Sequence, residues 1–319
     1  MSEDQWLPFW PPVASNTAVS VDRLFIGELA LSIVILGLVF GMIIVFSIRY
    51  RRGSAADRGN RVKKTWHWEI GWTVGSLAVF LCLFVWGANA YVWLFEPPRH
   101  PDLEIYVIGK QWMWKMEHPG GQREIDELHL PVDKTVRLLM TSEDVIHSFF
   151  VPAFRVKHDV LPGQYETMWF KPTETGRFRI QCAQFCGTQH AHMIGDVVVE
   201  SEAEYAQWLT TQGVHASLAQ QGEALFRADG CSGCHSANST VHAPSLAGIY
   251  GRVVHLQSGE ARIVDETYLR DCILLGGAHI DVAGYPPVMP SLAGKISEGD
   301  ILELISYIQS LSSQPGGSP

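Results

Sequence analysis

The sequence predicts a multidomain membrane protein, in which a two-helix transmembrane hairpin is followed by an all-β domain and then by an all-α domain. Three observations support this prediction: two long uncharged stretches near the N-terminus, short β-type segments between residues 96 and 208, and amphipathic helical segments after residue 219. A chain of 319 residues has room for two soluble domains besides the hairpin.

The two uncharged stretches are Leu29–Ile48 and Ile70–Phe95. Twenty helical residues rise about 30 Å, which is the thickness of the hydrocarbon core of a bilayer. Two buried core helices are the alternative, but such helices rarely stay uncharged for so long. We therefore expect spans at about 24–48 and 70–95. The segment 1–23 is expected to be exported, by the orientation argued below. It lacks the basic region of a signal peptide, so we do not expect it to be cleaved.

The segment between the spans, "RYRRGSAADRGNRVKK", sets the orientation. It has seven Lys and Arg residues against the single Asp57. Positive-inside reasoning makes residues 49–65 a cytoplasmic loop and places both soluble domains outside, on the periplasmic side of a bacterial-type cytoplasmic (inner) membrane. The exported parts are net negative, with 11 basic against 17 acidic residues in 96–205 and 5 against 10 in 219–319. This charge does not favour nucleic acid, whereas a basic protein partner would suit it.

Residues 96–208 show the pattern of a β sandwich or barrel. Aromatic and β-branched segments such as "LEIYVIGK", "TVRLLMTS", "YETMWFK", "RFRIQCA" and "GDVVVE" are separated by turn sequences such as "HPGG" and "PTETG". A polar linker at 209–218 follows. Helical periodicity then recurs in "LAQQGEALFRADG", "DETYLRDCILLGG" and "EGDILELISYIQSL", which makes 219–311 an all-α domain, and 312–319 is expected to be a disordered tail.

The segment "QCAQFCGTQHAHM" contains a candidate metal site. Cys182, Cys186, His190 and Met193 follow one another at spacings of four, four and three residues. Structural zinc sites use closed sets of thiolate and imidazole, whereas thiolate, imidazole and a weak thioether together favour copper. Since one Cys is sufficient for a single copper, the second predicts a pair of coppers bridged by both sulfurs. The second imidazole would come from His147 in "VIHSFFVP", at the end of an earlier strand.

The segment "CSGCH" has the c-type haem attachment pattern, in which Cys231 and Cys234 add to the haem and His235 is an axial ligand. A redox or zinc role is the competing reading, but flanking helices and an exported location favour haem. Met289, the only Met after residue 193, is the candidate sixth ligand, with His279 as the alternative. Cys82 and Cys272 lie in apolar segments and are expected to be inert packed thiols, so no disulfide is predicted.

Together, "GKQWMWKME", "SEDVIHSFFVP", "CAQFCGTQHAHM" and "CSGCH" resemble subunit II of cytochrome c oxidase with a cytochrome c domain fused at its C-terminus. The resemblance covers roughly residues 7–205 and 219–311. It implies that the all-β domain is a cupredoxin domain with the dinuclear copper centre CuA, and that the all-α domain is a class I cytochrome c. The side chains that match the CuA ligands are His147, Cys182, Cys186, His190 and Met193.

Other positions are implied by the resemblance alone. Gln184 would contribute its backbone carbonyl to CuA. Many family members have a magnesium-binding Glu there, and Gln is a weaker ligand, which puts an interfacial magnesium ion in doubt. Trp112 matches an aromatic residue that accepts electrons above the copper, although a core Trp is an equal alternative. Glu69 matches a Glu at the mouth of a proton channel, and an acid favoured by the helix dipole is its alternative.

The resemblance implies that electrons enter a haem-copper terminal oxidase through this chain. They would pass from cytochrome c, or from another respiratory complex, through haem c and CuA to a catalytic subunit. That subunit would reduce oxygen to water with proton translocation, in a lipid-embedded complex with other oxidase subunits. A CuA subunit of a nitric oxide reductase is the alternative, which the gas consumed would distinguish. A quinol oxidase typically lacks the copper ligands, and a membrane-tethered carrier or copper-handling protein does not need both cofactors.

Overall fold

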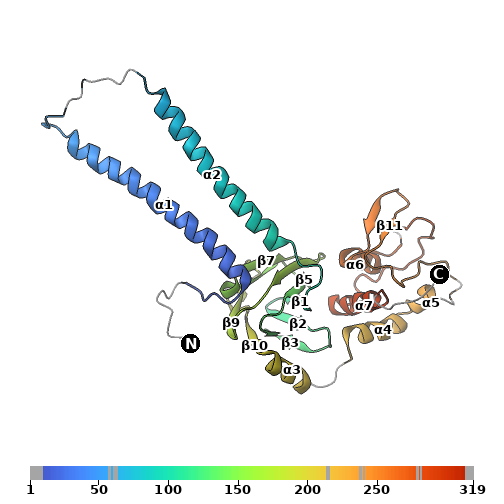
Figure 1. The fold of residues 1–319 in the computed structure, drawn as a ribbon. Helices are drawn as coiled ribbons and strands as arrows, with labels where there is room; N and C mark the ends of the chain where they lie inside the picture. Colours follow the sequence, from blue (N-terminus) through green and yellow to red (C-terminus); the bar gives the residue numbers. More distant parts are fainter. Residues whose placement is uncertain are drawn as a thin grey trace. The chain divides into compact units, whose positions relative to one another are not determined.

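The computed structural model describes residues 10–56, 59, 64–212, 216–236, 239, 241–277, 280 and 282–312. The chain forms two compact units (Figure 1). One is the hairpin from Asn16 to Pro97, and the other combines the segment before Asn16 with the chain from Pro98 onward. Residues 313–319 of the predicted disordered tail lie outside the described residues.

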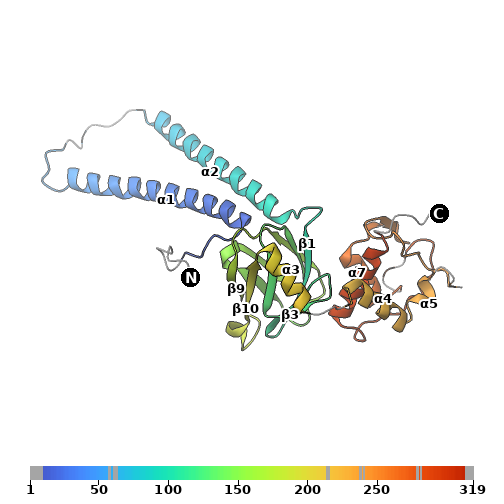
Figure 2. The ribbon, with the colours of Figure 1, turned by 60° about the horizontal axis from the view of Figure 1, so that its bottom comes forward.

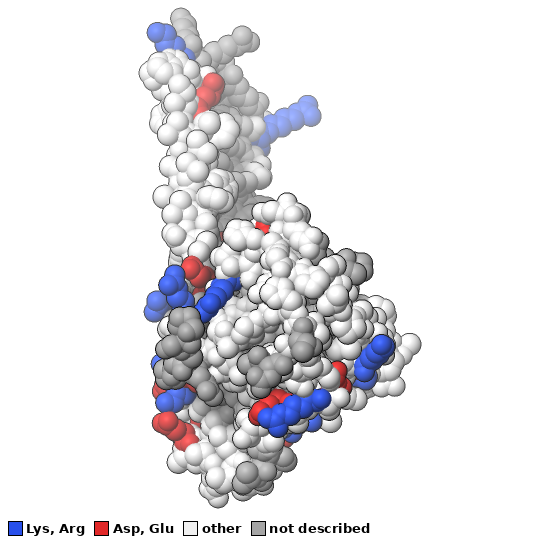
Figure 3. Space-filling model, turned by 90° about the vertical axis from the view of Figure 1, so that its right-hand side faces the viewer, with Lys and Arg blue, Asp and Glu red and all other residues white. Residues whose placement is uncertain are grey.

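The hairpin consists of α1 (Asn16–Arg49) and α2 (Trp66–Phe95). Both helices are long and apolar enough to cross a membrane. Their surfaces are largely free of charge (Figure 3), and side chains such as Ile33 and Phe84 are more than half exposed. The 34 residues of α1 rise about 51 Å, so this helix is longer than the span predicted at 24–48. Cys82, expected to be a packed thiol, is exposed on α2.

The β domain is a sandwich of two five-stranded sheets, as the sequence predicts. The first sheet has the order β3-β2-β1-β5-β8 and the second the order β4-β10-β9-β6-β7. The strands are β1 (Leu103–Lys110), β2 (Met113–Glu117), β3 (Arg123–Ile125), β4 (Glu127–Pro131), β5 (Val136–Ser142), β6 (His147–Val151), β7 (Val156–Val160), β8 (Glu166–Phe170), β9 (Gly176–Cys182) and β10 (Ile194–Glu200). A 3₁₀ turn, η1 (Pro152–Phe154), separates β6 from β7.

Inward-facing residues of the two sheets fill the core of the sandwich. Trp114 and Phe149 are fully buried and meet edge to face, with ring centroids 5.0 Å apart. On β2, the buried Trp114 stands between the partly exposed Met113 and Lys115, which is the period-two pattern of a strand with one buried face. The N-terminal segment belongs to this unit, because the Ser15 hydroxyl donates a hydrogen bond to the Phe154 carbonyl at 2.9 Å.

Helix α3 (Glu202–Thr211) closes the β domain and was not expected, since the sequence analysis placed these residues at the end of the β domain and in the first part of the linker. A capping box formed by Ser201 and Glu204 starts it. The helix lies against β4 and β10 (Figure 2). Only residues 209–211 of the predicted linker belong to this helix, whose Tyr205 is buried.

The C-terminal domain contains α4 (Leu218–Ala228), α5 (Ser232–His235), α6 (Glu266–Leu275) and α7 (Glu298–Ser310). Helices α4 and α7 cross closely at Gly222, where an added Cβ would meet the Glu303 carbonyl oxygen at 1.9 Å. A small antiparallel pair, β11 (Val253–His255) and β12 (Ala261–Ile263), interrupts the helical pattern. Strands of three residues are too short for periodicity to reveal. The predicted helical domain is confirmed, with this hairpin as an addition.

Candidate copper and haem sites

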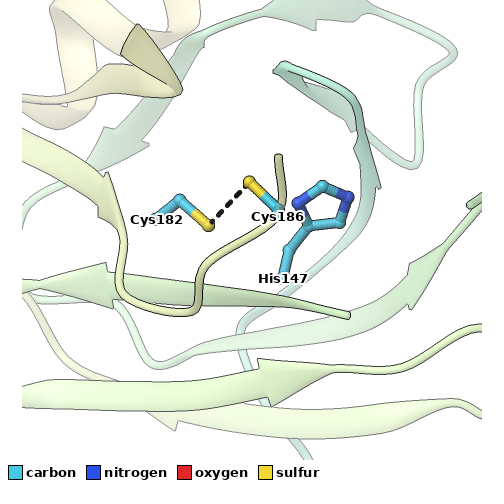
Figure 4. Close-up of side chains that lie close together, drawn as sticks. All are labelled: His147, Cys182 and Cys186. Atoms are coloured by element: carbon cyan, nitrogen blue, oxygen red, sulfur yellow. Dashed lines mark hydrogen bonds between the residues drawn. The ribbon is translucent and has the colours of Figure 1, made fainter. Parts of the chain in front are cut away.

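The candidate copper ligands come together at one end of the sandwich. His147 is the first residue of β6, Cys182 is the last of β9, and Met193 directly precedes β10. Cys186 and the turn η2 (His190–His192) lie in the loop between β9 and β10. Figure 4 shows His147 and both thiols converging on one spot. The sequence analysis placed His147 at the end of a strand, which is wrong: His147 begins β6, because the residues directly before it form a bend.

The distances between ligand atoms are short throughout this cluster. The two sulfurs of Cys182 and Cys186 lie 3.7 Å apart, and Cys186 Sγ is 3.5 Å from His190 Nδ1 and 3.8 Å from Met193 Sδ. The Gln184 carbonyl oxygen is 3.2 Å from Cys182 Sγ. His147, Cys182, Cys186 and Met193 are buried. Two sulfurs so close together, without a disulfide, are well placed to share metal ions.

The orientation of His147 fits a metal ligand. Its Nε2 lies 2.8 Å from Asp144 Oδ1, which makes Nε2 the protonated nitrogen. Its Nδ1 is buried and has no hydrogen-bond partner. A buried polar atom without a partner is costly, and a metal ion would satisfy it. The carboxylate thus fixes the tautomer that presents a lone pair to the thiols.

The two thiols differ in acidity. Burial opposes ionisation of Cys182, but the adjacent His147 imidazole and backbone groups of Ser148 and Gln184 lower its pKa. Burial and the neighbouring Cys182 charge raise the pKa of Cys186. Without metal, the pair therefore favours one thiolate and one thiol. Since copper binds thiolates, loading the site would release a proton.

Trp112 borders the loop between β9 and β10 that carries candidate copper ligands, which we call the copper loop. It does not lie in the core of the sandwich. It is half-buried, and its Nε1 donates to the Cys186 carbonyl at 3.2 Å. The same carbonyl accepts a hydrogen bond from Gln111 Nε2 at 2.8 Å. The core position is taken by Trp114, which is fully buried. Trp112 therefore stands between solvent and the backbone of a candidate ligand.

The C-terminal domain encloses a cavity of about 490 Å³ lined by the CSGCH segment. Cys231, Cys234 and His235 lie on its wall, and apolar side chains such as Leu269 and Ile308 complete it. His235 Nδ1 donates to the Pro244 carbonyl at 2.9 Å, which leaves Nε2 free as an axial ligand. An apolar cavity with two thiols and an oriented imidazole fits a covalently attached haem.

Met289 lines the same cavity, which fits its predicted role as the sixth ligand of a haem iron. Its carbonyl accepts a hydrogen bond from Gly277 N at 2.9 Å, which ties the Met289 loop to the end of α6. His279, the alternative ligand, lies outside the described residues. Cys272 also lines the cavity, and burial raises its pKa to about 11, as expected for an inert thiol.

Glu69 lies in the first turn of α2. Its carboxylate accepts a hydrogen bond from the Thr65 hydroxyl at 2.6 Å, and Thr65 is the residue that precedes the helix. An acidic side chain in the first turn is stabilised by the positive end of the helix dipole, so the position of Glu69 fits the alternative role. A role in proton uptake stays a prediction.

Comparison with known proteins decides the family. Residues 122–202 match the model for the periplasmic domain of cytochrome c oxidase subunit II, and residues 219–312 match that for cytochrome c. The alternative cytochrome c oxidase subunit 2 of Bradyrhizobium diazoefficiens is 31% identical over 264 residues, which cover 70% of this chain and 91% of that protein. The chain belongs to the cytochrome c oxidase subunit 2 family.

Other members of the subunit 2 family are similarly distant. Cytochrome c oxidase subunit 2 of Alkalihalophilus pseudofirmus is 28% identical over 305 residues, covering 89% of this chain and 86% of its own. A crystal structure of the periplasmic domain of subunit II from Bradyrhizobium japonicum is 36% identical and covers 37% of this chain and 96% of that one, with a TM-score of 0.36.

Sequence reasoning missed two groups that orient the candidate ligands of this subunit 2. Asp144 fixes the His147 ring, and the Pro244 carbonyl fixes the His235 ring. Asp144 precedes His147 by three residues, which is a signal that could have been noticed. Pro244 stands nine residues after His235 in an irregular loop, and nothing in that spacing indicates a contact.

Proposed function

We propose that electrons enter a haem-copper terminal oxidase through this chain, which accepts them at haem c and passes them by way of CuA to a catalytic subunit. That subunit reduces oxygen to water with proton translocation. One observation carries the proposal: the same chain holds a cluster of two thiols and two imidazoles, and a cavity lined by CSGCH. A simple copper carrier has no use for the second feature.

Dinuclear copper is the cofactor that the cluster fits. The two ions would be held by the thiolates of Cys182 and Cys186 together with His147, His190, Met193 and the Gln184 carbonyl. When bound, the copper pair supplies a one-electron carrier. The surrounding protein would hold the ligands in nearly one arrangement, because most of them are buried between strands, and orientation and tuning are the protein's contribution to such chemistry.

Haem c is the cofactor that the C-terminal cavity fits. It would be attached through Cys231 and Cys234, and His235 and Met289 would hold its iron. Thioether ligation raises the haem potential, which suits acceptance of electrons from a cytochrome c or another respiratory complex. Trp112 is the proposed point of transfer above the copper loop, and Glu69 the proposed mouth of a proton channel.

The chain would be anchored by α1 and α2 in the cytoplasmic (inner) membrane of a bacterium, beside the catalytic chain and other oxidase subunits. Both soluble domains would face the periplasm. We do not include magnesium among the cofactors, since Gln184 offers a neutral amide where a carboxylate would bind the ion better.

A test of the copper assignment is the electron paramagnetic resonance spectrum of the oxidised complex. Two equivalent copper nuclei sharing one spin give seven hyperfine lines, whereas a single copper gives four. We expect seven lines and two coppers per chain, and loss of the seven-line pattern in Cys186→Ser. Four lines with one copper would contradict a shared centre.

The gas consumed by the purified complex tests the reaction. We expect oxygen consumption with reduced cytochrome as donor. Consumption of nitric oxide in place of oxygen would instead favour the alternative, a CuA subunit of a nitric oxide reductase. Isolation of the chain without companion subunits would contradict both.

A further inference from the structure

The outer face of the β3-β2-β1-β5-β8 sheet is covered by the C-terminal domain. Tyr106 and Ile108 of β1 and Leu139 of β5 are at most 4% exposed. They form one apolar cluster with Leu218 of α4 and Leu302 of α7, both of which are completely buried. We call these five side chains the docking cluster.

Helix α7 has two apolar faces with different partners. Ile301 and Leu304 belong to the core of the C-terminal domain, together with Phe226 and Leu269. Leu302 belongs to the docking cluster instead. A helix that is apolar on opposite faces is one that is buried on both. A domain surrounded by water on a loose tether would expose Leu302.

Arg123 of β3 links the two domains beside the docking cluster. Its guanidinium donates to Glu303 of α7, and its Nε lies 3.2 Å from Glu117 Oε1 on β2. Both carboxylates are at most 6% exposed, and burial raises the pKa of each while Arg123 opposes the rise. Without the guanidinium, two buried carboxylates from two domains would face each other, which is strongly unfavourable.

Arg270 of α6 makes a second polar link. It is 7% exposed, its Nη1 donates to the Gly163 carbonyl at 3.0 Å, and its guanidinium lies 5.9 Å from the centre of the Tyr165 ring. Glu298 of α7 holds the same guanidinium. An apolar centre with hydrogen-bonded charges at its border is the organisation of a stable interface.

We propose that the C-terminal domain is a permanent partner of the cupredoxin sheet, seated through the docking cluster, Arg123 and Arg270, and that it does not move on a flexible tether. The docking rests on the proposed function in one respect: it would hold the haem domain in one position relative to the copper ligands, which matters only if electrons pass between them. Ile108 of the docking cluster is followed by Gly109, where an added Cβ would lie 2.9 Å from His147 Cδ2. Strand β1 thus contacts both α7 and a candidate copper ligand.

Cleavage of the connection between the domains tests this. A protease recognition sequence would replace residues 213–215 in the full chain, which is purified within its complex in detergent and then cleaved. Size-exclusion chromatography at micromolar concentration follows the haem absorbance. We expect the haem-bearing fragment to stay with the membrane-anchored half at high salt. Release of the wild-type fragment would overturn the proposal.

A matched pair of variants shows whether the docking cluster holds the fragment. Leu302→Glu should release it, because a carboxylate would be buried against Tyr106 and Ile108. Leu275→Glu, at a position that is 41% exposed on α6, should leave it bound. If the Leu302→Glu fragment stays attached, or both variants release it, the cluster does not act as proposed.

A charge exchange tests the link through Arg123. Arg123→Glu should weaken association of the cleaved halves about 100-fold or more, and addition of Glu303→Arg should recover much of it. The pairing would be overturned if the Arg123→Glu halves bind each other as tightly as the wild-type halves, or if the double variant recovers no affinity. Haem absorbance is measured before cleavage in each variant. Missing haem in the wild type would contradict the proposed function, whereas a wild-type fragment that carries haem and is nevertheless released would contradict the docking alone.

Discussion

At the residue scale, the ligands are held by neighbours that the sequence did not reveal. The spacing of Cys182, Cys186, His190 and Met193 was sufficient to predict their convergence, since a short loop between strands brings them together. The choice of His147 rested on the strand pattern and on the need for a second imidazole, and the resemblance led to the same residue. Asp144 was not predicted, although its position three residues before His147 places it within reach of the His147 ring.

Asp144→Asn should weaken copper binding about 10- to 100-fold, because the amide removes the charge that holds His147 in its metal-binding tautomer. Copper titration of the purified complex would measure the change. Asp159→Asn, at an exposed position on β7, is the matched control and should bind as the wild type does. Equal affinity in both variants would show that Asp144 does not orient the ligand.

At the element scale, α3 is anchored by a cluster of His118, Glu124 and His129. Glu124 lies 2.7 Å from His118 Nε2 and accepts a hydrogen bond from His129 N at 3.0 Å. Trp208 of α3 stacks on the His129 ring, with centroids 4.5 Å apart. Sequence patterns located the strands, but they could not show that His118, directly after β2, and His129 of β4 share one carboxylate beneath a helix.

This cluster predicts a pH-dependent stability. Burial opposes protonation of His129, but Glu124 raises its pKa above 6.5, so its contribution is complete below pH 6.5 and is lost as pH rises through the folded pKa. Burial opposes ionisation of Glu124, but its two histidine partners lower its pKa below 4.5, so its contribution is lost as pH falls through that lower value. Stability from the pair is therefore greatest between about pH 4.5 and 6.5.

Thermal unfolding at pH 6 and pH 8.5 would measure this effect. The wild type should lose about 1–2 °C more on the change to pH 8.5 than His129→Gln does. His100→Gln, at an exposed position, should behave as the wild type. An identical pH response in His129→Gln would mean that the ion pair contributes nothing.

Gly222→Ala should destabilise the C-terminal domain by about 1–3 kcal/mol, because the added Cβ would overlap the Glu303 carbonyl where α4 crosses α7. Thermal unfolding followed by haem absorbance measures the loss. Gly299→Ala on α7 is the control, since the nearest atoms to its added Cβ lie 3.6 Å away or more, at ordinary van der Waals contact. Comparable loss in both variants would exclude the helix crossing as the cause.

At the scale of the whole molecule, composition predicted the hairpin and the two soluble domains, because uncharged length and changes in periodicity are properties of long segments. It could not predict that the C-terminal domain packs on the cupredoxin sheet. Tyr106 and Ile108 lie on a strand whose other residues also look apolar, so the sequence does not distinguish an inner face from a docking face.

The orientation in the membrane is a prediction of the seven basic residues between the spans. A reporter fused near Ser54 should behave as cytoplasmic, and one fused after Ser313 as exported. An exported reporter at Ser54 would contradict the haem assignment too, since haem of the c type is attached outside the cytoplasm.

The central claim is that electrons reach the copper centre through the haem of the same chain. Stopped-flow reduction of the intact complex by a cytochrome donor tests it most directly, with haem c and copper followed at separate wavelengths. The haem should fill before the copper in the wild type, and copper reduction should slow strongly when Cys231 and Cys234 are both replaced by Ala. Copper that fills first, or fills at an unchanged rate without the haem, would contradict this order.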